Sequence, residues 1–440
     1  MENISNPMEK SLRSEKLLSR NRMMIILGAF LWAIYFIVQG QFLHDYLASF
    51  TYFQPIYISV LVIVVSISGA IVSILAGAIS DHITLPFGKR KPFILVGGFV
   101  SASLLFALPF CKHIASIIFL NVIMSIFNTA AFVCNNSFIP DSSTYKNLGK
   151  HTSLVAIGSA FGTIAGYALM IIQSSVLVFF IAGGICVLGY LILGIVIREP
   201  SPLKTRGNWL DDLKVTLQLK TIQREHNFLY FLISHFFLHT GINIYLPFLV
   251  IFLTQDNHSH SSELIGLGLS MKNGEILIVF IIMTILSLVL SLPFGYLSDQ
   301  FKTTKIMVFI RLSFAIGTAL ICLTPLIGKN NPLVIGILFI IPYSITNTGD
   351  TIFRGSLMYQ LIPYEKRAQF LGWVNLAKIC AQIPGVLIGG LLAQFLQRGY
   401  QYGFLTAGFL LFSSLPFLIL IHSSSLKKNS YQKSSSANIG

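Results

Sequence analysis

Two side chains of opposite charge lie one helical turn apart within a long apolar stretch of the sequence. Asp350 and Arg354 are four residues apart, so on a helix they share one face as an i, i+4 pair. Lys378 lies inside the next apolar stretch. At a rise of about 1.5 Å per residue, Asp350 lies roughly 15 Å before the end of its predicted helix and Lys378 roughly 15 Å after the start of the next one. Because these helices are consecutive in the sequence, a contact between Asp350 and Lys378 is geometrically available.

Ionisable groups inside apolar segments are costly, and this cost points to a function. Asp350 can carry a proton, with Lys378 and Arg354 setting its pKa and responding to its charge. Alternatively, Arg354 or Lys378 can bind an anionic group of a substrate. A third interpretation is a permanent ion pair that only stabilises the structure.

A second polar stripe lies on the predicted helix 228–254. His235, His239 and Asn243 occur at i, i+4 and i+8, which places them on one face. Histidine binds and releases protons near neutral pH. Two histidines at this spacing can also chelate a metal, but the helix offers no acidic or sulfur partner nearby. We therefore expect a polar stripe facing a cavity and no metal site, with hydrogen-bonded packing as the alternative.

Three further apolar stretches carry uncharged polar or aromatic side chains at helical spacing. Aromatic faces and amides suit sugar hydroxyls, by stacking and by paired hydrogen bonds, although hydrogen bonding between helices can explain any single Asn. The stripes contain Trp32, Tyr35 and Gln39 in the first, Asn121, Ser125, Asn128 and Asn135 in the second, and Ser344, Asn347 and Thr351, followed by Arg354, in the third.

The composition identifies the elements that must position these residues. The 440-residue chain is 54% hydrophobic and 10% charged, with several apolar runs near or above the ~20 residues that cross a bilayer as a helix. Isolated strands cannot cross lipid, so we expect an all-α membrane protein. The predicted helices are 23–42, 56–79, 93–111, 114–139, 152–172, 175–197, 228–254, 276–297, 306–327, 332–358, 368–396 and 401–422.

The basic residues predict how the helices are oriented. With the N-terminus inside, the cytoplasmic segments hold 23 Lys or Arg and the outer segments hold four, which places both termini in the cytoplasm of a cell-membrane protein. The net charge of +14 therefore indicates basic cytoplasmic loops rather than nucleic-acid binding. The predicted organisation is a cytoplasmic tail 1–22, a six-helix bundle 23–197, a central loop 198–227, a second bundle 228–422 and a tail 423–440.

The two predicted bundles share short motifs at a nearly constant offset. The pattern Gly77-x-x-Ser80-Asp81 returns 218 positions later as Gly295-x-x-Ser298-Asp299, and "SIFNT" at 125–129 returns 219 positions later as "SITNT" at 344–348. Glycine ridges also occur in both halves, as Gly158, Gly162 and Gly166 and as Gly385, Gly389 and Gly390, and they predict tight helix packing. A duplicated six-helix unit is typical of secondary transporters.

The stretch "GAISDHITLPFGKRKPF" at 77–93 concentrates charge between two apolar runs. A G-x-x-x-D motif followed by a basic cluster, in the loop between the second and third helices, resembles the signature loop of the major facilitator superfamily. The insert before the basic cluster is similar to the glycoside–pentoside–hexuronide cation symporters and the sucrose-transporter-like branch. This resemblance implies twelve transmembrane helices in two pseudo-symmetric six-helix bundles, with helices one, four, seven and ten lining a central cavity.

The same stretch predicts a cytoplasmic gate, a breakable latch between the bundles. Its glycines permit close helix approach, its carboxylates accept hydrogen bonds from helix N-termini or pair with arginine, and its basic residues meet anionic lipid. The alternative is that the cluster only sets the topology. The resemblance implies that Asp81 and Arg90 are the main members. The predicted gate comprises Gly77, Asp81, Lys89, Arg90, Lys91, Asp141, Gly295 and Asp299.

These features predict a secondary active transporter that takes up a small polar solute, a sugar or glycoside, together with protons. Melibiose-type symporters carry acidic residues in the second helix for the cation, and this sequence has none there, so a proton is the expected coupling ion. No nucleotide-binding P-loop or nucleophile elbow occurs, so we expect neither an enzyme nor a cofactor. We expect a monomer. An exporter of amphipathic drugs or lipids and a non-transporting membrane sensor are the alternatives.

Overall fold

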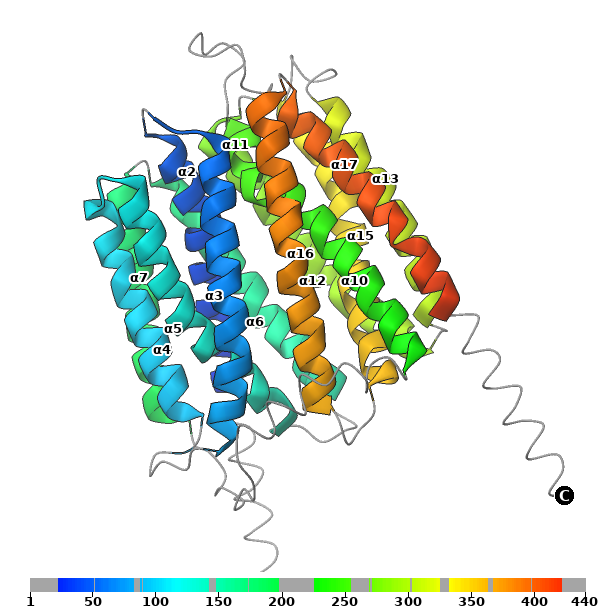
Figure 1. Ribbon diagram of the computed structural model, residues 1–440, viewed down its shortest axis with the longest axis horizontal. Coiled ribbons are helices and arrows are strands. Elements are labelled where there is room, and N and C mark those ends of the chain that lie inside the picture. Colours follow the sequence, from blue (N-terminus) through cyan, green and yellow to red (C-terminus); the bar gives the residue numbers. More distant parts are fainter. Residues whose placement is uncertain are drawn as a thin grey trace, which may run out of the picture. The chain divides into compact units, whose positions relative to one another are not determined.

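The computed structural model contains helices as its regular elements (Figure 1). It describes residues 23–50, 52–82, 88, 90–141, 148–172, 174–197, 225–254, 269, 271–300, 303–324, 332–362, 367–396 and 398–421. These residues cluster into two compact units. Unit 1 comprises Met1–Phe42 and Ile71–Leu213, and unit 2 comprises Leu43–Ala70 and Lys214–Gly440.

Unit 1 begins with a helix over 23–37 that continues into the π-helix η1. Its other elements are α4 (Lys91–Leu104), η2 (Leu105–Phe110), α5 (Ile114–Asp141), α6 (Leu148–Ala168), η4 (Leu169–Ile171) and α7 (Ser175–Val196), with η1 spanning Val38–Phe42. Helix α3 (Pro55–His82) starts in unit 2 and ends in unit 1.

Unit 2 holds the remaining helices. They are α2 (Leu43–Ala48), α10 (His226–Tyr245), η5 (Leu246–Phe248), α11 (Leu249–Thr254), α12 (Asn273–Gln300), α13 (Thr303–Leu320), η6 (Ile321–Leu323), α15 (Pro332–Leu361), α16 (Arg367–Phe395) and α17 (Gly399–Ser413). The predicted helix 228–254 is interrupted at Pro247, which lacks the backbone N–H that an α-helix needs.

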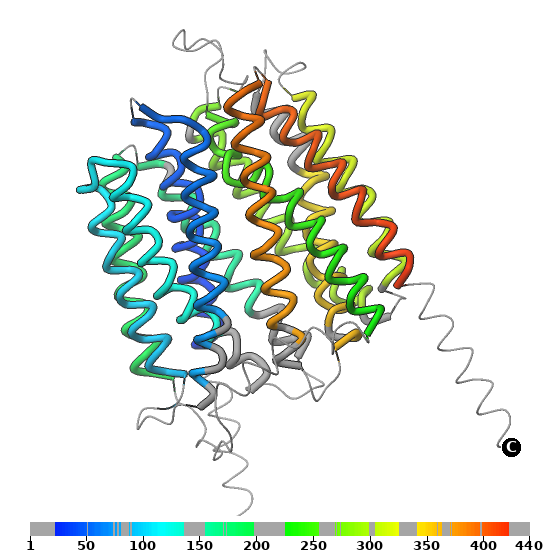
Figure 2. Tube along the Cα trace, viewed as in Figure 1, coloured from blue at the N-terminus to red at the C-terminus, as the bar shows by residue number. Residues whose placement is uncertain are grey.

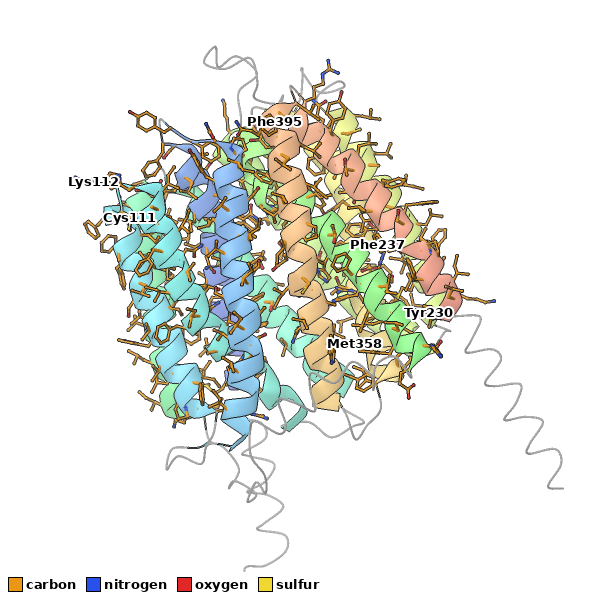
Figure 3. The ribbon with its side chains drawn as sticks, in the orientation of Figure 1. Cys111, Lys112, Tyr230, Phe237, Met358 and Phe395 are labelled. Atoms are coloured by element: carbon orange, nitrogen blue, oxygen red, sulfur yellow. The ribbon has the colours of Figure 1, made fainter. Side chains whose placement is uncertain are left out.

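Ten helical segments in the described ranges are long and apolar enough to cross a membrane. The other two predicted helices are also present, as α6 and α15. The expected all-α membrane architecture is therefore confirmed. Large apolar side chains remain exposed on the helix surfaces, as Figure 3 shows for Phe395 at the end of α16, which is 68% exposed. An apolar exterior of this kind suits contact with lipid.

The glycine ridges pack as predicted in both units. In unit 1, a Cβ on Gly158 or Gly162 of α6 would collide with the backbone carbonyl of Ile26 or Phe30 in the first helix. In unit 2, a Cβ on Gly385 of α16 would lie 2.5 Å from the Thr240 carbonyl oxygen of α10. Figure 2 shows α16 running beside α10, in agreement with their extensive contacts. The fifth helix of each predicted bundle therefore packs on the first helix of that bundle.

The units differ from the predicted bundles in residues 43–70, which cluster with unit 2. Two hydrogen bonds explain this. The Ser59 hydroxyl of α3 donates to the Val386 carbonyl oxygen of α16 at 2.8 Å, and the Ser66 hydroxyl donates to Oε1 of Gln382 at 3.0 Å. The first part of α3 therefore belongs to the same compact unit as α16.

Candidate functional site

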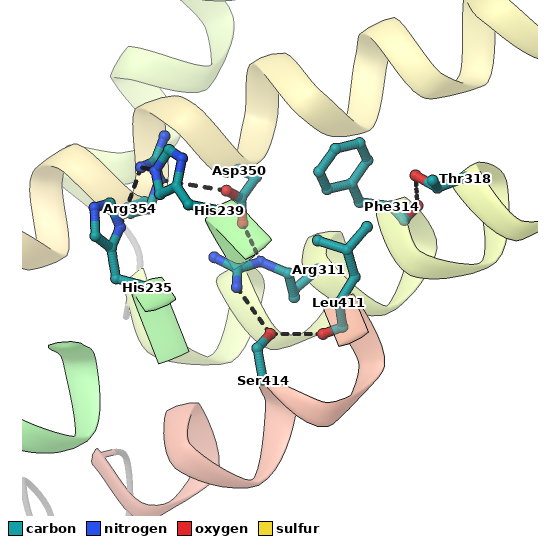
Figure 4. A network of polar contacts seen from close by, with 9 residues as sticks. All are labelled: His235, His239, Arg311, Phe314, Thr318, Asp350, Arg354, Leu411 and Ser414. Atoms are coloured by element: carbon teal, nitrogen blue, oxygen red, sulfur yellow. Dashed lines mark hydrogen bonds and ion pairs between the residues drawn. The ribbon is translucent and has the colours of Figure 1, made fainter. Parts of the chain in front are cut away.

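Asp350 lies at the centre of a buried polar network in unit 2 (Figure 4). Its Oδ1 accepts a hydrogen bond from Nε of Arg311 on α13 at 2.5 Å. Its Oδ2 lies 3.4 Å from Nε of Arg354, one turn further along α15. Each oxygen of the single carboxylate thus faces a different guanidinium group.

The geometrically available contact between Asp350 and Lys378 is not present. Lys378 is exposed on α16, and the ion-pair partners of Asp350 are Arg311 and Arg354. The reason lies in the helix packing. Helix α15 packs on α12 and α13, whereas α16 packs on α10 and α17, so α15 and α16 are consecutive in the sequence without being main neighbours in space.

Arg311 is the functional candidate that our sequence interpretation did not assign to the site. Its side chain is 0% exposed, and its Nη1 donates to the Ser414 hydroxyl at 2.9 Å. Ser414 in turn donates to the Leu411 carbonyl oxygen at 2.6 Å. A signal was available in the sequence, because a lone arginine within the apolar stretch 306–327 requires an anionic partner.

The histidine pair on α10 completes the network. Nη1 of Arg354 lies 3.3 Å from Nδ1 of His235 and 3.0 Å from Nε2 of His239, and the two imidazole rings are 4.3 Å apart between centroids. Because guanidinium only donates, both imidazoles must accept at these atoms. His235 therefore carries its proton on Nε2, which is buried and has no hydrogen-bond partner in the described part of the chain.

Asn243, the third residue of the stripe predicted on α10, has a local partner. Asn243 turns back along α10, and its Nδ2 donates to the His239 carbonyl oxygen at 2.7 Å. It therefore shares the face of the histidines without joining their contact to Arg354. Asn347 is half-buried on α15.

Unit 1 presents a neutral counterpart to this network. Trp32 of the first helix stacks on Phe36 and on Phe132, with ring centroids 5.1 and 4.5 Å away. Nε2 of Gln39 donates to Oδ1 of Asn121 at 2.6 Å. The interhelical hydrogen bond and the aromatic stack join the first helix to α5 without any charge.

Tyr35 is more deeply buried than the two residues predicted to share its helix face, Trp32 and Gln39. Tyr35 is 0% exposed, whereas Trp32 and Gln39 are half-buried. The three-residue step from Trp32 rotates Tyr35 by about 60° around the helix, enough to turn it into the interior of unit 1.

Like Asn121, the other two predicted asparagines of α5 are buried. The Oδ1 atoms of Asn128 and Asn135 accept no hydrogen bond from the described residues. Asn135 packs so closely on Gly28 that a Cβ at that glycine would lie 2.7 Å from its Nδ2. These amides are therefore held between helices and retain hydrogen-bonding capacity.

Most of the predicted gate lies outside the residues whose side chains the structure describes. This applies to Gly77, Asp81, Lys89, Asp141 and Asp299. Arg90 is buried at the N-cap of α4, and Lys91 begins that helix half-buried.

Gly295 differs from the expectation of a close helix approach. A Cβ built on it would meet no atom within 4 Å. In this conformation the described part of the chain therefore shows no close contact that requires a glycine there.

Comparison with known proteins identifies the family. The profile of the Major Facilitator Superfamily matches residues 23–353 and 231–437, so the chain belongs to this transporter family. A search of curated protein sequences gave no match. The more specific resemblance to the glycoside and sucrose branch has no such support.

Solved structures share the fold at low sequence identity. A crystal structure of the nucleoside transporter NupG matches with a TM-score of 0.70 and 14% identity, covering 92% of this chain and 99% of that one. A bacterial homologue of the iron transporter ferroportin, in an outward-facing state, matches with a TM-score of 0.67 and 12% identity over 92% and 99% of the chains. A bacterial homolog of the human lysosomal transporter Spinster, inward-facing and occupied, gives 0.66 and 13% over 96% and 98%.

Proposed function

We propose that this protein is a secondary active transporter that moves a small polar solute together with protons by alternating access. The observation that carries the proposal is the double role of Arg354, which faces Asp350 and is also held by His235 and His239. A buried cation with two alternative sets of partners can exchange one set for the other, and such an exchange can couple to a conformational change of a membrane protein.

Each histidine can either bind a second proton or accept a hydrogen bond from Arg354, but not both. Each imidazole accepts from Arg354 through a nitrogen lone pair, and a protonated imidazole has none left. A proton on His235 or His239 therefore releases Arg354 from the pair. Arg311 of α13 and Lys378 of α16 also repel a positive charge on either histidine, so movement of Arg354 away from the pair removes one of three repulsions.

Asp350 is the alternative proton carrier, and its contacts favour the histidines instead. Both of its oxygens face guanidinium groups, so a proton on the carboxyl would weaken two ion pairs at once. In the proposed cycle Asp350 stays charged, and its ion pair with Arg354 becomes shorter when the histidines are protonated.

The neutral aromatic and amide residues of unit 1 support a sugar or glycoside as the solute. Trp32 with its stacked neighbours offers an aromatic face, and Gln39, Asn128 and Asn135 offer amides. The same aromatic surface favours, as a second candidate, an exporter of amphipathic compounds.

The test uses proteoliposomes with the full chain and a panel of sugars, glycosides, amino acids and organic acids. We expect one solute to drive proton uptake in the wild type. The His235→Gln/His239→Gln double variant should keep solute counterflow, which needs no proton gradient, and lose the proton signal. It should also lose the pH dependence of solute uptake that protonation of these two imidazoles produces.

His44→Gln is the matched control, because His44 is a buried histidine of unit 2 that contacts the Pro247 carbonyl oxygen outside the network. Proton movement that survives in the double variant would reject the histidines as carriers. Counterflow without any proton movement in the wild type would reject coupling. Efflux of amphipathic dyes alone would favour the exporter, and no movement of any solute would favour a sensor.

The predicted orientation belongs to the same proposal. Both termini and the loop 198–227 should be accessible from the cytoplasm of the cell membrane. This is tested by introducing a single cysteine at either terminus of the protein and labelling intact cells with a reagent that does not cross the membrane. Labelling of either terminus from outside would contradict the predicted orientation.

A further inference from the structure

The helices around the network contain more positive than negative charge. Helix α12, which packs on α15, has acidic residues only near its two ends, at Glu275 and Asp299. In α10, α13, α15, α16 and α17 the only acidic residue is Asp350. Away from the helix starts, the same five helices contain three basic residues, Arg311, Arg354 and Lys378. The histidines add no negative charge. The inner part of unit 2 therefore carries two positive charges that no carboxylate of these helices balances.

The charges of Arg354 and Lys378 differ from that of Arg311 in their exposure and in their partners. Arg311 is fully buried and makes the short hydrogen bond to Asp350, so this pair neutralises itself. Arg354 is 18% exposed and lies further from the carboxylate. Lys378 is exposed and makes no hydrogen bond or ion pair to the described residues.

Arg354 and Lys378 also act on each other. Their positive charges repel each other. Lys378 lies between Phe370 and Gly385, which contact Phe228 and Thr240 of α10, so it is on the stretch of α16 that packs along the segment of α10 carrying the two histidines that contact Arg354. Two accessible cations that repel each other inside an apolar layer form an unfavourable arrangement unless an anion joins them.

We infer that the transported solute carries an anionic group, a carboxylate or a phosphate, which Arg354 and Lys378 bind within unit 2. This inference rests on the proposed function and names its substrate class. The planar guanidinium pairs with two oxygens of such a group, and the ammonium adds a charge with three donors. Asp350 does not repel the anion strongly, because Arg311 lies against it.

The same contact explains how solute and proton can be linked. An anion competes with Asp350 and with the histidines for the one guanidinium of Arg354. When the anion takes this group, the histidines lose their donor and gain a free lone pair each. Solute binding therefore prepares His235 and His239 to accept protons.

The experiment measures thermal unfolding of the full chain in detergent with solute pairs that differ in charge. The pairs are glucuronate and glucose, glucose 6-phosphate and glucose, and lactate and glycerol, all at one ionic strength set with sodium chloride. We expect at least one anion to raise the melting temperature while its neutral partner does not. The apparent affinity should fall about tenfold or more in Lys378→Gln, as expected for loss of a charged partner.

Two further variants keep this test decisive. Lys378→Arg retains the charge and should retain most of the affinity. Lys272→Gln removes an exposed lysine of the same unit just before α12 and should leave the affinity unchanged. Failure of every anion to stabilise the protein, equal stabilisation by a neutral partner, or equal losses in Lys378→Gln and Lys272→Gln would each overturn the inference.

The outcomes separate this inference from the proposed function. Anion binding that depends on Lys378, without proton movement in proteoliposomes, would refute proton coupling alone. Proton-coupled transport of a neutral solute would refute the anion alone.

Discussion

The two units share their helix packing and differ in the charge of their interiors. In unit 1, the described contacts between the first helix and α5 are an aromatic stack around Trp32 and the neutral hydrogen bond from Gln39 to Asn121. In unit 2, the corresponding helices α10 and α15 meet through Arg354 and two histidines. Both units nevertheless place a glycine ridge against their first helix.

One pair of equivalent positions shows this difference most directly. At the offset of 219 residues that relates the repeats, Asn135 corresponds to Arg354. Asn135 packs on Gly28 of the first helix, whereas Arg354 contacts imidazoles of α10. Packing constrains both copies of a duplicated fold, because steric overlap is costly in either one. Polar chemistry is free to differ, so one unit can hold the charges.

The largest effect should come from removing the carboxylate. Asp350→Asn leaves Arg311 buried without an anion, and it should destabilise the protein by about 3–5 kcal/mol. The neutral counterpart Asn135→Ala leaves no buried charge without a partner, and it should cost about 1 kcal/mol, the typical loss for a point substitution. Thermal unfolding in detergent measures both.

A second variant shows whether the charge is the cause. Arg311→Met in the Asp350→Asn background removes the uncompensated cation and should recover most of the lost stability. Equal losses in Asp350→Asn and Asn135→Ala would contradict the contrast between the units.

Removing a single hydrogen bond should destabilise the protein more in unit 2 than in unit 1, by a smaller margin than removal of the carboxylate. Ser414→Ala removes the acceptor of the buried Arg311 Nη1, and bonds to charged groups contribute about 1.5–3 kcal/mol. Gln39→Leu removes a neutral bond and should cost about 0.5–1.5 kcal/mol. Melting temperatures of the two variants give the ranking, and a larger loss in Gln39→Leu would reverse it.

The shared packing should produce the same response in both units. Gly162→Ala and Gly389→Ala each force a methyl group into the backbone carbonyl of a neighbouring helix, at Phe30 and Ile244 respectively. Overpacking of this kind costs about 1–3 kcal/mol. Gly295→Ala is the control, since its Cβ would meet open space. If only one of the two ridge variants melts early, the units do not share this packing.

Apolar stretches and local spacing were sufficient to predict the helices and several site residues. The i, i+4 relation of Asp350 and Arg354, and that of His235 and His239, is a property of any α-helix and is present in the structure. Arg354 also proved to face both histidines, which the sequence offered only as separate stripes.

The partner of Asp350 could not be predicted in the same way. The geometrically available contact with Lys378 was inferred from closeness along the sequence, but α15 packs on α13, which brings Arg311 to the carboxylate. Tyr35 shows the same limit, because its burial depends on what packs around the first helix.

Sequence by itself determined the membrane class, the positions of twelve helices, the repeat and the resemblance to a transporter family that the family profile confirms. These features depend on hydropathy, helical period and short motifs, which are local. Only the tertiary structure decided that Arg311 balances Asp350, that Arg354 is shared with two histidines and that Lys378 stays without a partner among the described residues. Such pairings depend on which helices pack together and on how each is rotated about its axis, and an almost uniformly apolar helix surface encodes neither.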